Sequence, residues 1–126
     1  MIIGIDVGST TGYAIWDEDQ NILVESGNIL SQGIENSILS KQYVGATVIV
    51  EYPVNTPTCP RSAKSAARKI QALFPQAIEV VPGQWKNSGI QIRSPFPWKR
   101  YPEPTPHQRD AYWILRFGME LAKAKV

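Results

Sequence analysis

The alternation of short β-branched segments with amphipathic helical segments is the feature that most constrains the fold of this chain. Five segments have the composition or alternation typical of strands: residues 1–7, 12–17, 21–30, 46–53 and 77–81. Helical spacing of apolar residues is clear in two segments and weaker in a third: residues 61–74, 106–125 and 33–42. A turn rich in Asp and Asn separates the second strand from the third, which predicts a hairpin. We therefore expect an α/β fold with a five-stranded mixed sheet, in which one hairpin strand is antiparallel and helices flank the sheet.

The start and the buried face of the last helix can be predicted in detail. Four prolines between Ser94 and Pro106 exclude a helix or a central strand there and predict a loop. Thr105 then provides an N-cap, Pro106 takes the first helical position, and Gln108 can complete a capping box. The expected buried stripe of this helix comprises Ala111, Ile114, Leu115, Gly118, Leu121 and Ala122.

Length and composition bound the class of protein. A chain of 126 residues fits one domain, so we expect a single domain over residues 1–126. No apolar run approaches the ~20 residues that cross a bilayer, and the N-terminus lacks the order of segments found in a signal peptide. The one cysteine, Cys59, excludes an intrachain disulfide and multi-cysteine zinc sites. We expect a reducing, cytoplasmic setting and no membrane.

The basic residues are concentrated in one part of the chain. Residues 61–101 contain eight Lys or Arg residues and one acid, whereas the rest of the chain has an excess of acids. This division predicts a basic surface for a polyanion, with an ordinary solvated surface as the alternative. The expected DNA-binding residues are Arg61, Lys64, Arg68, Lys69, Lys86, Trp98, Lys99 and Arg100. Trp98 can either stack on an unpaired base or pack the proline-rich loop onto the core.

Four potential ligand side chains are predicted to meet at one edge of the sheet. Asp6 lies near the C-terminal end of the first strand and Glu51 near that of the fourth, so both carboxylates emerge at the same edge if these strands are neighbours. His107 and Asp110 lie in the buried stripe of the last helix, one turn before its apolar part. A buried acid without a partner costs free energy, and a divalent cation would compensate it.

Three carboxylates and an imidazole form a hard ligand set that suits Mg²⁺, with Mn²⁺ as a substitute, better than zinc. Two metal ions ~4 Å apart would activate water and stabilise the leaving oxygen in phosphodiester cleavage. We therefore expect Asp6, Glu51, His107 and Asp110 to be the metal-binding and catalytic residues. Three of them also have an ordinary structural interpretation: Asp110 can favour the helix dipole, His107 can belong to the helix cap, and Glu51 can pair with a neighbouring basic residue. That all three residues have only these structural roles is less expected.

Four segments resemble, in order, those of the RuvC-type Holliday junction resolvases of the RNase H-like superfamily. They are GIDVGSTTGYAI, VIVEYP, VVPGQWKNSG and HQRDAYWI. The resemblance implies an RNase H-like domain and a compact, phage-type, homodimeric endodeoxyribonuclease that uses Mg²⁺ to cleave branched DNA. It implies that His107 binds metal or orients the attacking water, and that Lys86 lies close to the DNA backbone.

The sequence has three alternative interpretations. The opening segment also resembles the phosphate loop of actin-like ATPases, but here it enters a hairpin strand and not a helix, so we expect no nucleotide cofactor. An RNase H-like nuclease that acts on RNA or on other DNA structures is the first alternative. A non-catalytic nucleic-acid-binding module is the second, although it leaves Asp6, Glu51 and Asp110 unexplained.

Overall fold

The computed structural model describes residues 1–37, 39 and 45–124. Its elements, in chain order, are β1 (Ile2–Asp6), β2 (Thr10–Asp17), β3 (Ile22–Leu30), the 3-10 helix η1 (Ser31–Asn36), β4 (Thr47–Glu51), α2 (Arg61–Leu73), β5 (Ile78–Glu79), the 3-10 helix η2 (Gln84–Asn87), α3 (Ile90–Arg93) and α4 (Pro106–Ala124). The first part of the helix predicted for residues 33–42 corresponds to η1, which ends at Asn36. Residues 38 and 40–42 lie outside the described residues.

The strands form one five-stranded sheet in the order β3-β2-β1-β4-β5. The pairs β1–β2 and β2–β3 are antiparallel, whereas β1–β4 and β4–β5 are parallel, which confirms the predicted mixed sheet and its hairpin. The fifth strand is shorter than the predicted residues 77–81. The amide of Val80 still donates to the carbonyl of Val50 at 2.8 Å, but Val81 is exposed and the chain then turns at Gly83, whose φ is 79°.

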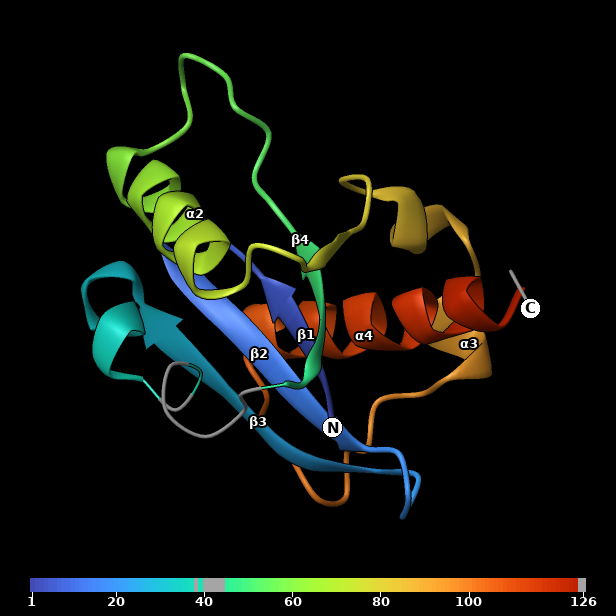
Figure 1. The fold of residues 1–126 in the computed structure, drawn as a ribbon. Coiled ribbons are helices and arrows are strands. Elements are labelled where there is room, and N and C mark those ends of the chain that lie inside the picture. Colours follow the sequence, from blue (N-terminus) through green and yellow to red (C-terminus); the bar gives the residue numbers. More distant parts are fainter. Residues whose placement is uncertain (38, 40–44, 125–126) are drawn as a thin grey trace.

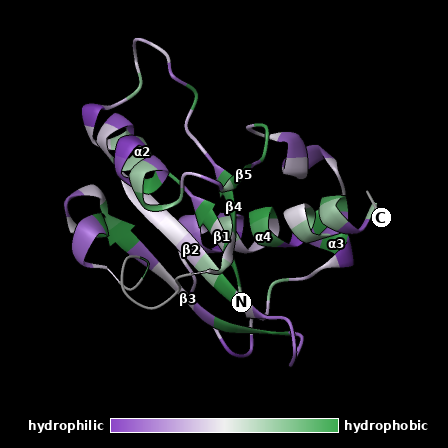
Figure 2. Cartoon of the chain, in the orientation of Figure 1, coloured by the Kyte–Doolittle hydropathy of each residue, from purple (hydrophilic) through white to green (hydrophobic). Residues whose placement is uncertain are grey.

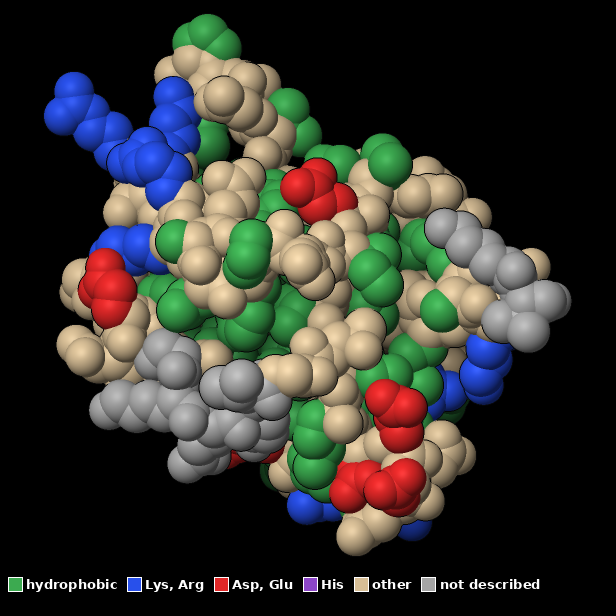
Figure 3. Space-filling view, in the orientation of Figure 1, with side chains coloured by type: hydrophobic (Ala, Val, Ile, Leu, Met, Phe, Trp, Pro, Cys, Tyr) green, Lys and Arg blue, Asp and Glu red, His purple; other side chains and the backbone are tan. Residues whose placement is uncertain are grey.

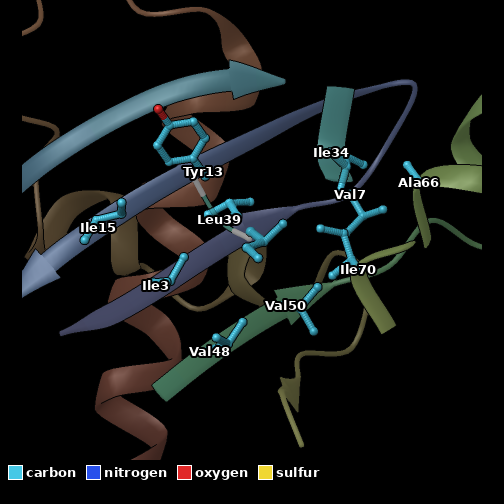
Figure 4. Packing of buried hydrophobic residues seen from close by; sticks show 11 residues of the cluster. Ile3, Val7, Tyr13, Ile15, Ile34, Leu39, Val48, Val50, Ala66 and Ile70 are labelled. Atoms are coloured by element: carbon cyan, nitrogen blue, oxygen red, sulfur yellow. The ribbon is translucent and has the colours of Figure 1, made fainter. Parts of the chain in front are cut away.

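The two faces of the sheet are covered by different helices (Figure 1). On one face, alternate residues of β1 and β4 pack with η1 and α2 in a cluster that includes Ile3, Val50 and Ile70 (Figure 4). On the other face, α4 covers the sheet, and Ile49 packs with Ile114. Hydrophobic residues accordingly line β1, β4 and the middle of α4, whereas hydrophilic residues occupy much of α2 (Figure 2).

The predicted N-terminus of α4 is confirmed in its details. The side chain of Gln108 accepts a hydrogen bond from the Thr105 amide at 2.8 Å, and the Thr105 hydroxyl accepts one from the Gln108 amide at 3.2 Å. This reciprocal capping box fixes where the helix begins. Within the described residues, no helix is both long enough and apolar enough to cross a membrane.

The predicted buried stripe of α4 is correct over its first half and wrong at its end. Ala111, Ile114 and Leu115 are fully buried, but Leu121 is 37% exposed and Ala122 is exposed as well. Helical spacing identifies which side of a helix is apolar, but it does not show where the sheet beneath it ends. The last turns of α4 extend beyond that edge.

Candidate active site

The first two residues of the site lie side by side at the ends of two parallel strands. Asp6 of β1 and Glu51 of β4 are directly paired in the register, and the Val7 amide donates to the carbonyl of Glu51 at 3.1 Å. The side chains of Ile5 and Val50, one residue earlier, point into the core beneath α2. Because side chains alternate along a strand, both carboxylates face the side of the sheet that α4 covers. The prediction that they share one edge is confirmed.

The first turns of α4 bring the other two predicted residues to this edge. His107 Nδ1 lies 3.6 Å from Asp6 Oδ2, with the His107 side chain 46% exposed and the Asp6 side chain 17% exposed. Gly12, the partner of Asp6 in β2, makes this approach possible, because a Cβ there would overlap the backbone carbonyl of His107. Asp110, one turn further along α4, is close enough for its charge to act on both Asp6 and Glu51.

The carboxylates of the site are crowded and partly withdrawn from water. Burial, followed by the negative charges of Asp110 and Glu51, raises the pKa of Asp6 to about 7 from an ordinary value of 3.8, and His107 opposes the rise. Burial also raises the pKa of Asp110, against the positive charge of Lys86. These carboxylates therefore repel one another at neutral pH, and a cation among them would relieve the repulsion.

Glu51 is held by two hydrogen bonds that the sequence did not predict. The Trp85 indole donates its Nε1–H to Glu51 Oε2 at 2.8 Å, and the Gly83 amide donates to the same oxygen at 3.3 Å. Burial raises the pKa of Glu51, and these two bonds, together with the charge of Lys86, oppose the rise. In the sequence, the only signal for this contact is the tryptophan beside Lys86 in the segment PGQWKNSG.

The donor set fits a hard divalent cation, although it is not a finished cage. Among residues 1–37, 39 and 45–124, no three His, Cys, Asp or Glu side chains converge closely enough to form a ready-made metal site. Mg²⁺ does not require one, because it keeps several waters and binds through one or two carboxylates together with substrate phosphates. Asp6, Glu51 and Asp110 would supply the oxygens. Such a cation would offset the cost of burying the Asp6 carboxylate and, after it, the repulsion from Asp110 and Glu51, which together raise the pKa of Asp6.

The predicted DNA-binding residues fall into three groups. Arg61, Lys64 and Arg68 lie on the outer side of α2, where Lys and Arg side chains gather at one end of the molecule (Figure 3). Lys86, in η2, is at the site itself, where its charge acts on Glu51 and Asp110. Lys69 differs from its neighbours, because its ammonium binds the Ser31 carbonyl at 2.9 Å and Glu35 at 3.0 Å and so joins α2 to η1.

The third group lies in the loop between α3 and α4, away from α2. Trp98, Lys99 and Arg100 are all exposed there. The ring of Trp98 packs edge-on against the buried Phe96, with ring centroids 5.3 Å apart, and yet 49% of the residue is exposed. Phe96 belongs to the cluster beneath α4, so this loop and α2 lie on opposite faces of the sheet. The structure therefore does not gather the predicted DNA-binding residues into one patch.

Comparison with known proteins identifies the architecture. No protein-family model and no curated protein matches the sequence. RuvC of T. thermophilus, in complex with a Holliday junction substrate, aligns with a TM-score of 0.63 and 13% identity over 91% of this chain and 90% of its own. Fowlpox virus resolvase, in complex with Holliday junction DNA, aligns with a TM-score of 0.65 and 15% identity over 95% of this chain and 99% of its own. The chain therefore has a RuvC-like resolvase fold of the RNase H-like type.

Proposed function

We propose that this protein is a divalent-metal-dependent endonuclease that cleaves branched DNA, with the four-way Holliday junction as its leading substrate. The observation that carries the proposal is the meeting of Asp6, Glu51 and Asp110 at the ends of β1 and β4, beside His107. The two resolvase structures compared above are complexes with Holliday junction DNA, which supports this choice of substrate. A DNA substrate also favours a location inside the cell.

The chain's own residues divide the work in the following way. Asp6, Glu51 and Asp110 would hold Mg²⁺ or Mn²⁺, two ions at the full site, and His107 would bind metal or orient the attacking water. The bound metal would lower the pKa of a water and stabilise charge on the phosphate during cleavage. Lys86 would contact the DNA backbone beside the site, and Arg61, Lys64 and Arg68 would bind phosphates further along the strand.

We also propose that the protein acts as a homodimer, because symmetric cleavage of a junction needs two sites. Sedimentation of the protein alone and on a junction tests this. Two copies per junction are expected. A monomer both free in solution and on the junction would contradict the proposed homodimer.

The substrate itself is tested with a panel of equal-length labelled substrates: a four-way DNA junction, a linear duplex of the same sequence, and a four-way RNA junction. We expect cleavage of the DNA junction in Mg²⁺ or Mn²⁺, and none by the Glu51→Gln variant. Equal cleavage of the linear duplex would contradict the branched substrate, and cleavage of RNA alone would favour an RNA nuclease. Tight binding without cleavage by the wild type would favour a non-catalytic binding module.

A further inference from the structure

We propose that Trp85 is a positioning residue for the metal site, which holds one oxygen of Glu51 so that the other is presented to the cation; this inference rests on the proposed function. Both donors to Glu51, the Trp85 indole and the Gly83 amide, bind the same oxygen, Oε2, at 2.8 and 3.3 Å. Within residues 1–37, 39 and 45–124, no hydrogen-bond donor is placed on Oε1. The carboxylate is therefore fixed at one oxygen and available at the other.

The donor is itself held in place by packing. Trp85 is only 1% exposed and packs in the cluster of Ile90 and Phe117 on the α4 side of the sheet. Its ring stacks on Trp113 of α4, with centroids 5.9 Å apart and 27° between the planes. Trp113 is anchored in turn, because its own indole N–H donates to the Ser94 carbonyl at 3.0 Å. The position of the Trp85 N–H is thus set by α4, the same helix that carries His107 and Asp110.

A packing role alone does not explain an indole at this place. Phe is also apolar and can stack on Trp113, whereas a buried indole N–H without a partner costs free energy. Here the N–H is satisfied by a carboxylate of the site, and a hydrogen bond to an ionised group is among the stronger ones. Side chains that orient a metal ligand in this way typically contribute about 10–100-fold to metal affinity.

The stacked pair provides its own matched control. Trp85→Phe removes the N–H that reaches Glu51 and leaves a smaller aromatic ring. Trp113→Phe removes the N–H that reaches Ser94 and causes the same loss of ring size in the same stack. Free Mn²⁺ in titrations of each protein is measured by electron paramagnetic resonance, without DNA, so the result does not depend on activity. We expect Trp85→Phe to weaken Mn²⁺ binding about 10-fold or more, and Trp113→Phe to change it by less than about threefold.

A second measurement uses the folded wild type alone. The indole N–H signal of Trp85 in a ¹H–¹⁵N spectrum, assigned by its loss in Trp85→Phe or by isotope-edited contacts to neighbouring residues, is followed as Mg²⁺ is added. We expect this signal to shift further than that of Trp113, because its acceptor is a metal ligand. Equal weakening of Mn²⁺ binding by both substitutions, or an unmoved Trp85 signal at saturating Mg²⁺, would overturn the positioning role.

The failure of the proposed function has a different signature. If wild type binds Mn²⁺ and Asp6→Asn does not, the metal site stands, and only the behaviour of Trp85→Phe decides the inference. If wild type does not bind Mn²⁺, or binds it no better than Asp6→Asn does, the metal-dependent function fails, and the role of Trp85 fails with it.

Discussion

Replacing Asp6 by Asn should stabilise the metal-free protein. The pKa of Asp6 is raised to about 7 from 3.8, by burial first and then by Asp110 and Glu51. Below pH 3.8 this group is protonated in both the folded and the unfolded chain. As the pH rises from there to about 7, the unfolded chain releases the proton while the folded chain retains it, so the free energy of unfolding falls. Above about pH 7 the loss is complete.

The size of this loss follows from the two pKa values. Since one pKa unit is worth about 1.36 kcal/mol, ionising Asp6 in the folded state costs up to about 4 kcal/mol. Asn carries no charge at any pH, so Asp6→Asn should avoid this cost. Near pH 8 in EDTA we expect the variant to melt above the wild type, by on the order of 10 °C. The difference should shrink as the pH is lowered.

Calorimetry in EDTA and in excess Mg²⁺ tests this reasoning. Mg²⁺ at about a hundredfold excess over its dissociation constant should stabilise the wild type by about 2.7 kcal/mol and leave Asp6→Asn unchanged. Glu18→Gln, in the exposed hairpin turn, is the charge-matched control and should change stability by less than about 0.5 kcal/mol. A variant that melts below the wild type near pH 8 in EDTA would refute the account, because the Asp6 carboxylate would then stabilise the fold as the partner of His107.

Two further predictions concern the approach of α4 and the surface of α2. Gly12→Ala should destabilise the protein by about 1–3 kcal/mol in urea unfolding and reduce Mn²⁺ affinity, because its Cβ would displace the first turn of α4, which carries His107. The control is Gly33→Ala, whose Cβ would meet its nearest neighbour at 3.7 Å and which should retain that affinity. Arg68→Gln should weaken junction binding and reduce the slope of log K against log salt by about 1, as for one lost phosphate contact. Lys123→Gln, at the other end of the molecule, should leave the slope unchanged. Equal effects of the two substitutions would contradict a specific role for α2.

The parts of the fold that the sequence predicts correctly are those set by local signals. Three such features are present: the first strand with Asp6 near its end, the hairpin after it, and the capping box at Thr105. Each depends on residues a few positions apart. Pairing β1 with β4 needed one further assumption, that these strands are neighbours. It placed Asp6 beside Glu51 correctly, because parallel strands end at a common edge.

The features that the sequence does not predict depend on how distant segments meet. The bond from Trp85 to Glu51 spans 34 residues and exists because Gly83, with φ of 79°, turns the chain back toward β4. The exposure of Leu121 depends on where the sheet ends beneath α4, and the helical spacing of apolar residues carries no information about that. In the sequence, Lys69 is indistinguishable from the exposed basic residues of the same helix, and only the position of η1 makes it the partner of Glu35.

The most direct test of the central claim is cleavage of one labelled four-way DNA junction by wild type and by Asp6→Asn, each in Mg²⁺ and in EDTA. The account predicts paired nicks by the wild type in Mg²⁺ alone, and binding without nicks by the variant. Cleavage in EDTA, cleavage by Asp6→Asn at the wild-type rate, or an intact junction with wild type in both Mg²⁺ and Mn²⁺ would contradict it.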